Sequence, residues 1–327
     1  MTSHAAIVTT LRDSAAVIAS FVAYHRAIGF EHLFLFFDDP ADSALAWARA
    51  QPHVTAIARD GALREAWSKL TRYGENAAHV EREVMARQVL NVEHAMNLAR
   101  AKGLKWLLHI DADELFYAPG GDAAAHFNWL DGTPIETVSY ANFEAVPETE
   151  ETGDFFRDVT LFKKPKLLRA PPSPDAKALI ERTGQLAPNF FHFYDNGKSA
   201  VRLSAAGMLP KGVHSFVRPG SYASAQSPEQ FILHYACCGF AALWQKYVTL
   251  GRFADQWWNK YDIAASIGPF HLQARDAVMT GDVEHARRFY RERVMIDEPA
   301  LLADLTRHKL LERIAEPAKI LAARKPA

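Results

Sequence analysis

The first third of the chain alternates between short apolar runs and longer segments with helical periodicity. Strands are predicted at residues 5–10, 32–37 and 54–58, and a helix with apolar positions every three or four residues runs from Ser14 to Gly29. This order folds into a parallel sheet with helices on its faces. The chain is therefore predicted to begin as the βαβαβ half of an α/β domain.

A long helix predicted over residues 80–101 leads into a fully apolar run, Trp106–Ile110, that ends in an acidic cluster. Such a run is typical of a strand buried on both faces, and open α/β sheets bind ligands at the carboxyl ends of their strands. Asp111 and Asp113 are two residues apart, so both carboxylates can address one point. Because like charges so close repel, they need a cation such as Mg²⁺ or Mn²⁺, or a shared proton. The alternative is that one caps the next segment and the other is solvated.

The rest of the chain is predicted less sharply. Residues 61–78 and the acidic segment from Glu144 to Asp154 are expected to be loops, and the chain from Phe240 onward is expected to be helical. We predict a main domain at residues 1–235 and a helical extension at 236–327. The other predicted elements are a helix at 123–130, a strand at 136–142, and strand-like stretches at 155–168 and 199–217.

Composition narrows the class of protein. Of 327 residues, 49% are hydrophobic and 23% charged, which excludes a disordered chain. The 37 Lys and Arg balance 38 Asp and Glu, so a formal net charge of −1 provides no global attraction for nucleic acid. We therefore expect no nucleic-acid partner, and any anion must be bound by local groups.

Cysteine usage and hydropathy suggest where the protein works. The two cysteines, Cys237 and Cys238, are adjacent and cannot link distant segments, which favours a reducing cytoplasm. No signal-peptide pattern is evident at the amino end. The longest apolar runs, including Trp106–Ile110, are far shorter than the roughly 20 residues of a spanning helix. We expect a cytoplasmic protein that is soluble or at most in peripheral contact with a membrane.

Residues 106–116, Trp-Leu-Leu-His-Ile-Asp-Ala-Asp-Glu-Leu-Phe, resemble the D-x-D-E-F signature of glycosyltransferases with the GT-A fold, in the family 2-like and family 92-like group. The resemblance spans roughly residues 5 to 250. Further stretches are similar to the group's Y-H-x-x-x-G, R-Q, K-S-x-V-R, G-V-H and H-Y segments: residues 21–30, Arg87-Gln88, residues 197–202, Gly212-Val213-His214 and His234-Tyr235.

This resemblance implies a Rossmann-like GT-A mixed sheet flanked by helices, and transfer of a sugar from a nucleotide sugar to an acceptor hydroxyl, usually with inversion. It also implies Mn²⁺ or Mg²⁺ held by Asp111, Asp113 and His214. Lys198 and Arg202 would screen the donor diphosphate, with solvated strand charges as the alternative. For His214 the alternative is a partly buried, hydrogen-bonded side chain.

The resemblance places the base and ribose of the donor at the ends of the first two strands. An acidic side chain there can accept from a nucleobase N–H or a ribose hydroxyl, although Asp38-Asp39-Pro40 also suits an ordinary turn. The donor-binding set that we predict is Thr9, Thr10, Arg12, Asp38, Asp39, Arg87, Asp111, Lys198 and Arg202.

Inversion requires a general base near the acceptor hydroxyl. Glu144 is the tentative candidate, but a surface position in the acidic loop is the stronger interpretation, and Asp195, His234 and Asp262 compete with it. The aromatic residues of the helical extension are expected to be core rather than sugar platforms, with Trp257 or Trp258 left to line an acceptor groove or a subunit contact. They are Trp244, Tyr247, Phe253, Trp257, Trp258 and Tyr261.

We therefore predict a metal-dependent, inverting glycosyltransferase of the hexosyltransferase type that uses a UDP-sugar to build a surface glycan or glycoconjugate. One alternative is a phosphatase-like hydrolase with Asp111 as nucleophile, although Glu114-Leu115 stands where that class has Thr or Val. The other is a nucleotide- or glycan-binding module without turnover.

Overall fold

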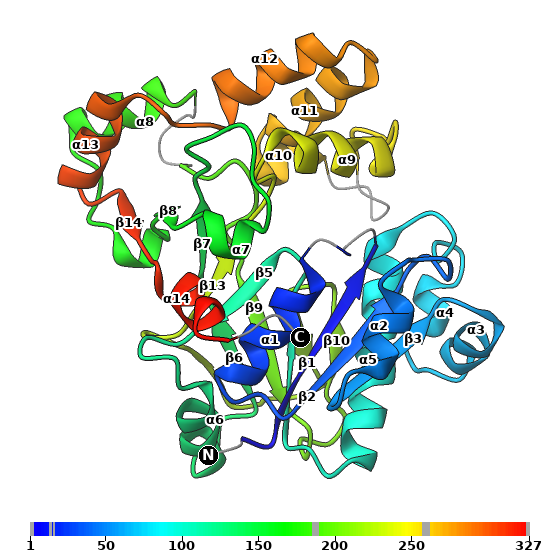
Figure 1. The fold of residues 1–327 in the computed structure, drawn as a ribbon. Helices are drawn as coiled ribbons and strands as arrows, with labels where there is room; N and C mark the ends of the chain where they lie inside the picture. The colour runs from blue at the N-terminus through cyan, green and yellow to red at the C-terminus, as the bar shows by residue number, and fades with distance from the viewer. Residues whose placement is uncertain (1–2, 13–14, 16, 185–189, 257–261, 325–327) are drawn as a thin grey trace. The chain divides into compact units, whose positions relative to one another are not determined.

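The computed structural model describes residues 3–12, 15, 17–184, 190–256 and 262–324 (Figure 1). The chain forms two compact units. The first contains residues 1–141, 196–232 and 323–327, and the second contains residues 142–195 and 233–322. These units differ from the predicted division at residue 235, because residues 142–195 group with the C-terminal helices.

The first unit is built on a seven-stranded mixed sheet. Neighbouring strands are parallel except at β9, which runs antiparallel to both β4 and β6. The predicted βαβαβ start is therefore confirmed. In spatial order the strands are β12 (Ser224–Gln226), β6 (Thr137–Tyr140), β9 (Lys198–Arg202), β4 (Trp106–His109), β1 (Ala5–Leu11), β2 (His32–Phe37) and β3 (Val54–Ala58).

Helices flank this sheet, as the sequence predicted for the α/β fold class. The helices of the unit are α1 (Ile18–Ala27), α2 (Leu45–Ala50), α3 (Gly61–Ser68), α4 (Tyr73–Asn76), α5 (Val84–Ala101) and α6 (Ala123–Asp131). The short strands outside the sheet are β5 (Glu114–Tyr117), β10 (Leu209–Lys211) and β11 (Ser215–Val217).

Helix α5 closes one face of the sheet. Its side chains Leu90 and Met96 belong to one buried cluster with Val8, Phe34 and Leu107 from the central strands. Strand side chains alternate between faces. Trp106 accordingly points to the opposite face, where its ring meets Phe127 of α6.

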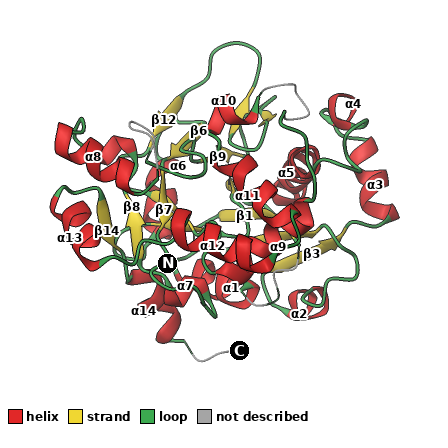
Figure 2. Cartoon of the chain, turned by 90° about the horizontal axis from the view of Figure 1, so that it is seen from above, coloured by secondary structure: helices red, strands yellow, loops and turns green. Residues whose placement is uncertain are grey.

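The prediction of a loop over residues 61–78 was wrong, because this segment contains α3 and α4. Asp60 caps α3 by accepting from the Leu63 N–H, and Leu63 and Trp67 are buried one helical turn apart. Both short helices lie beside α5 in the two views (Figures 1 and 2).

The second unit combines a small antiparallel sheet with helices. Strand β8 (Leu161–Lys163) pairs with β7 (Asn142–Ala145) and β14 (Leu311–Arg313), and β13 (Phe231–His234) leads into the unit. Helices α9, α11 and α12 pack together, as Figure 2 shows. The helices are α7 (Phe155–Asp158), the 3₁₀ turn η1 (Lys166–Leu168), α8 (Pro174–Arg182), α9 (Phe240–Leu250), α10 (Ile263–Ile267), α11 (Phe270–Met279), α12 (Val283–Arg293), α13 (Pro299–Arg307) and α14 (Glu316–Ala322).

The aromatic residues of α9 lie in the core, as predicted. Tyr247 is buried, and Trp244 is partly buried against the same cluster, as is Phe253 just after the helix. Trp257, Trp258 and Tyr261 lie outside the described residues. Among the helices of the described ranges, none is both long and apolar enough to cross a membrane.

Candidate active site

Polar side chains of helix α5 bind residues at the carboxyl ends of the central strands through an ion pair and hydrogen bonds. Arg87 forms a bidentate ion pair with Asp38, just after β2, with N to O distances of 2.5 and 2.7 Å. The next residue, Gln88, donates from Nε2 to Asp111 Oδ1, after β4, at 2.6 Å. Two consecutive residues of α5 thus bind the residues that follow two strands, at the edge of the sheet where a ligand site is predicted.

A third strand end is held one helical turn further on. Asn91 Nδ2 donates to Thr10 Oγ1 at 2.9 Å, and Asn91 Oδ1 accepts from Trp67 Nε1 at 3.0 Å. Residues four apart lie on one face of a helix, so Asn91 continues the row begun by Arg87. Asn91 was not among the residues predicted from the sequence, where a polar residue within the apolar face of this helix was the available signal.

Lys198, the first residue of β9, lies at the centre of the edge. Its side chain is fully buried, and its Nζ is 2.6 Å from Asp111 Oδ2 and 3.7 Å from Glu114 Oε2. Glu114 Oε2 also accepts from the Asp111 backbone N–H at 2.7 Å. The solvated alternative for Lys198 is therefore wrong: its ammonium is an internal cation between two carboxyl groups.

Electrostatics separate these two carboxyl groups. Burial raises the pKa of Glu114 to about 8, against the attraction of Lys198. Burial also opposes ionisation of Asp111, but Lys198, His109 and His214 outweigh it and hold the pKa of Asp111 well below its ordinary value. At neutral pH Asp111 is ionised and Glu114 is mainly protonated.

Gly197 and His214 lie next to Lys198 and Asp111 at this edge of the sheet. Gly197 has a φ of +64°, and a Cβ there would lie 1.9 Å from the Tyr140 carbonyl oxygen, so a side chain does not fit. Its carbonyl meets His214 Nδ1 at 2.8 Å. Because a carbonyl only accepts, Nδ1 carries a proton, and Nε2 is the ring nitrogen that could bind a metal. Metal-binding histidines are commonly oriented by such a bond.

The donor set suits a divalent cation that is shared with phosphate groups. The described ranges contain no ready cluster of three His, Cys, Asp or Glu side chains that could hold a metal ion. Mg²⁺, however, is usually bound by one or two carboxylates together with substrate phosphates. Asp113 is partly exposed, and its charge helps to raise the pKa of Glu114. Asp113 and His214 therefore offer the oxygen and nitrogen donors that such an ion needs.

His109 precedes Asp111 on the same face of the strand, and the sequence analysis did not select it. Burial lowers its pKa to about 3, so the ring is neutral, and it is hydrogen-bonded to the Val213 backbone. Within the described part of the chain its buried Nε2 has no hydrogen-bond partner. An orphaned nitrogen at this place fits a site that is completed by a ligand.

The residues predicted to contact the base and ribose differ in how far they are exposed. Asp38 and Arg87 are both buried and paired with each other, and Thr9 is fully buried. Asp39 is partly exposed and accepts from the Ala41 N–H at 2.8 Å, which is the turn alternative. Arg12 is exposed at the end of β1. In this group Arg12 is exposed and Asp39 partly exposed, whereas Thr9, Thr10, Asp38 and Arg87 are buried.

A small cavity of about 230 Å³ lies among the segments that follow β1 and β2. Trp47 of α2 is the one aromatic side chain among its lining residues, and Ile18 of α1 lies on its wall. Neither was selected from the sequence, where Trp47 read only as part of a helix. The cavity is formed by the starts of α1 and α2, the helices that follow these two strands.

Arg202 does not join the cluster. In the register of β9 it is paired with Trp106, at the opposite end of β4 from Asp111. Its Nε donates to the Ile135 carbonyl at 2.8 Å. Lys198 and Arg202 are four residues apart on one strand, roughly 13 Å, so only one of them can serve this edge.

Glu144 is not a surface residue of an acidic loop, and that interpretation was wrong. It is buried in β7, and its Oε1 is 2.9 Å from Nζ of the equally buried Lys163. Its carboxylate also accepts from the backbone N–H groups of His192 and Phe193 at 2.9 and 2.8 Å. As placed, the side chain fastens one segment of the second unit to another.

The competing general bases also lie in the second unit. Asp195 is exposed, and Asp262 caps α10 by accepting from the Ala265 N–H. His234 is buried and stacks on the Tyr194 ring with centroids 4.7 Å apart. The identity of the general base therefore stays a prediction.

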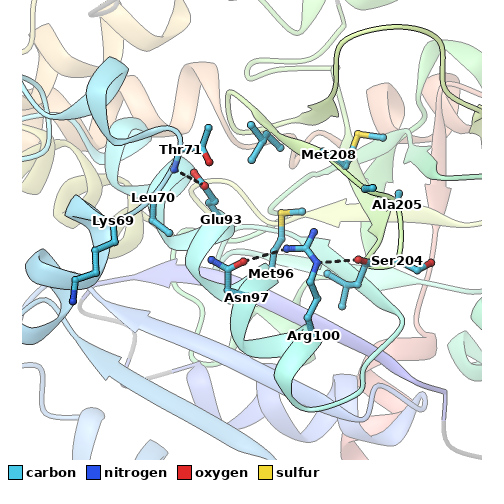
Figure 3. Close-up of a pocket in the computed structure, with 14 residues that line it drawn as sticks. Lys69, Leu70, Thr71, Glu93, Met96, Asn97, Arg100, Ser204, Ala205 and Met208 are labelled. Atoms are coloured by element: carbon cyan, nitrogen blue, oxygen red, sulfur yellow. Dashed lines mark hydrogen bonds between the residues drawn. The ribbon is translucent and has the colours of Figure 1, made fainter.

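A larger cavity, of about 460 Å³, lies on the outer side of α5 against residues 203–209 (Figure 3). Its main charged groups are already engaged. Glu93 accepts from the Thr71 N–H at 2.8 Å, and Arg100 donates to the Leu203 carbonyl at 2.9 Å. None of the predicted site residues lines this cavity.

Two plant proteins are similar to the chain. It is 28% identical over 312 residues to glycosyltransferase-like At2g41451 of Arabidopsis thaliana, which covers 92% of this chain and 68% of that protein. It is 27% identical over 315 residues to glycosyltransferase-like At3g57200 of the same plant, covering 92% and 59%. The chain thus spans only part of each relative's length. No protein-family model matches it.

Among solved structures, the chain is similar to glucosyl-3-phosphoglycerate synthase from Mycobacterium tuberculosis in complex with Mn²⁺, UDP and phosphoglyceric acid. The identity is 16%, the TM-score is 0.31, and the match covers 68% of this chain and 67% of that one.

Proposed function

We propose that the protein transfers a glycosyl group, a hexosyl group, from a nucleotide sugar to a hydroxyl group of a glycan or glycoconjugate, as in the building of a surface glycan. The observation that carries the proposal is the cluster of Asp111, Asp113, Lys198 and His214 at the carboxyl edge of the mixed sheet. It lies in a chain whose similarity to two proteins named glycosyltransferase-like covers 92% of its length.

In this proposal Asp113 and His214, with Asp111, hold Mn²⁺ or Mg²⁺. Neutralisation of the negative charge that develops on the leaving diphosphate is the chemistry that such an ion supplies. The chain's own residues prepare the place for it. Lys198 and Gln88 keep Asp111 ionised and oriented, and the Gly197 carbonyl sets the tautomer of His214.

The donor side of the proposal uses the same edge. The cavity at Trp47 would take the nucleobase against an aromatic face, with Arg12 and Asp39 at the surface beside the ribose and phosphates. UDP is the preferred nucleotide in this proposal, and inversion is the preferred stereochemistry. Asp38 and Arg87 act by holding the strand end rather than by touching the donor.

The test compares Asp113→Asn with Asp175→Asn, an exposed carboxylate on α8. Release of nucleoside diphosphate from UDP-sugars is measured with a pool of glycan acceptors, with and without Mn²⁺. Loss of one charge-stabilising group typically costs about 10²- to 10³-fold in rate, which is the expected loss for Asp113→Asn. Asp175→Asn should match the wild type, and all three proteins should melt alike.

Three results would contradict the proposal. Asp113→Asn could turn over as fast as the wild type. A covalent phosphate on Asp111 would point instead to a hydrolase with an aspartate nucleophile. Tight binding of UDP with Mn²⁺ but no turnover with any acceptor would leave a binding module.

A further inference from the structure

A short turn in the second unit holds two adjacent leucines in solvent. Leu167 is 51% exposed and Leu168 is 37% exposed, although both are large apolar side chains. The backbone of the turn is closed by bonds from the Leu168 N–H to the Pro165 carbonyl, at 2.9 Å, and from the Arg169 N–H to the Lys166 carbonyl, at 3.2 Å. The leucines are therefore presented by an ordered turn.

The same turn is basic on both sides. From Lys163 to Ser173 the chain carries four basic residues and no acidic one. Lys163 is buried and paired with Glu144, and Lys164 lies 3.0 Å from Glu312, so these two charges are largely compensated. Of the other two bases, Lys166 is exposed beside the leucines, whereas partly exposed Arg169 lies over the Phe190 ring, 5.8 Å from its centroid, and is attracted to Asp195.

A third base comes from a distant part of the chain. The Lys164 N–H donates to the Leu310 carbonyl at 2.9 Å, which brings exposed Lys309 to the neighbourhood of the turn. Net charge over the whole chain is only −1, so any attraction for anions is local to such a group. Exposed apolar side chains beside basic ones are the combination with which a peripheral segment binds an anionic membrane surface.

We propose that the η1 turn docks on an anionic lipid surface. Leu167 and Leu168 enter the boundary between head groups and acyl chains, while Lys166 and Lys309 lie at the level of the lipid phosphates. A protein partner is less well matched. A stable protein interface buries about 800 Å² on each side, and two leucines in a three-residue turn are a small apolar core for it. The inference uses none of the candidate active-site residues.

The test measures co-sedimentation of the full chain with phosphatidylcholine vesicles that contain or lack phosphatidylglycerol, at low and high salt. The variants are Leu167→Ser with Leu168→Ser, and Lys166→Glu alone. The matched control is Val248→Ser with Leu250→Ser on α9, an apolar pair that is 46% and 37% exposed. Melting curves verify that every variant folds.

The wild type should bind only the vesicles with phosphatidylglycerol, and high salt should weaken that binding. The double leucine variant should bind roughly tenfold more weakly, and Lys166→Glu several-fold more weakly, whereas the α9 control should match the wild type. Failure of the wild type to bind anionic vesicles overturns the proposal. So does an equal loss in the α9 control. Binding to soluble polyglutamate that needs both leucines, without vesicle binding, overturns it in favour of an acidic protein partner.

Discussion

Two lysine–carboxylate pairs, one in each unit, share their chemistry and differ in their surroundings. In the second unit, Lys163 Nζ lies 2.9 Å from Glu144 Oε1, and the two side chains are 1% and 2% exposed. In the first unit, Lys198 Nζ lies 2.6 Å from Asp111 Oδ2, with exposures of 0% and 24%. Both lysines are buried, so the carboxylates make the difference.

The carboxylate of the second unit is closed on all sides. Glu144 accepts from Lys163 and from two backbone N–H groups, which satisfies it inside the protein. The Asp111 carboxylate is partly exposed, and it interacts electrostatically with three further ionisable groups, Glu114, His109 and His214. A closed pair fastens a fold, whereas an open pair of the same chemistry can bind a ligand.

The largest expected effect comes from breaking the closed pair. Lys163→Met leaves the Glu144 charge buried without its cation, which typically costs about 3–5 kcal/mol in free energy of unfolding. Urea unfolding followed by tryptophan fluorescence measures it. Combining Lys163→Met with Glu144→Gln removes the orphaned charge and should recover most of the loss. A single variant as stable as the wild type would show that the pair does not hold this unit together.

A smaller loss of stability and a larger loss of binding are expected at the open pair. Lys198→Met removes the counter-charge of Asp111, but the carboxylate can draw on water through its exposed part. A hydrogen bond to a charged group is worth about 1.5–3 kcal/mol, so affinity for UDP with Mn²⁺ should fall roughly 10- to 100-fold. Titration calorimetry measures it, with Lys211→Met at the exposed end of β10 as the control.

The comparison loses its meaning if Lys198→Met destabilises the protein as much as Lys163→Met while leaving nucleotide affinity unchanged. In that case both lysines would be structural. For Lys163→Met we expect the nucleotide affinity of the wild type once the fraction of unfolded protein is subtracted. Lys163 belongs to the closed pair, which does not contact the nucleotide in the proposal.

Much of the open region could be predicted from the sequence, because it depends on local pattern. The alternation of strands and helices placed Asp111 and Asp113 at the carboxyl edge, and the resemblance of residues 197–202 to a family segment drew attention to Lys198. The choice between Lys198 and Arg202 was beyond reach, since it depends on the direction and register of β9. Residues such as Gln88 and Asn91 are common on helices, and their role depends on which strand ends α5 crosses.

The surroundings of the closed pair were much harder to predict, because they depend on long-range strand pairing rather than on local pattern. Glu144 reads as one of several acids before a polar loop, and nothing near it in sequence announces a buried cation. Its partner Lys163 is 19 residues away and reaches it only through the antiparallel pairing of β7 with β8. A long-range pair of this kind is visible only once the strands are paired.

The third expected effect is a pH dependence that comes from Glu114, beside the open pair. The pKa of Glu114 is raised from 4.5 to about 8, so between these values the folded protein holds a proton that the unfolded chain has released. By linkage, Glu114 therefore makes the free energy of unfolding fall as pH rises from 4.5 to 8, with an upper limit of about 1.4 kcal/mol per pH unit. Attraction to Lys198 lowers the folded-state pKa of Glu114 and so narrows this pH range; it is already included in the value of about 8. Glu114→Gln mimics the protonated form, so its unfolding free energy should lack this decline and exceed that of the wild type near pH 8. If the unfolding free energies of the wild type and Glu114→Gln, measured with urea, change with pH in the same way across this range, Glu114 is ionised in the folded protein. That result would remove the distinction drawn between the open and the closed pair.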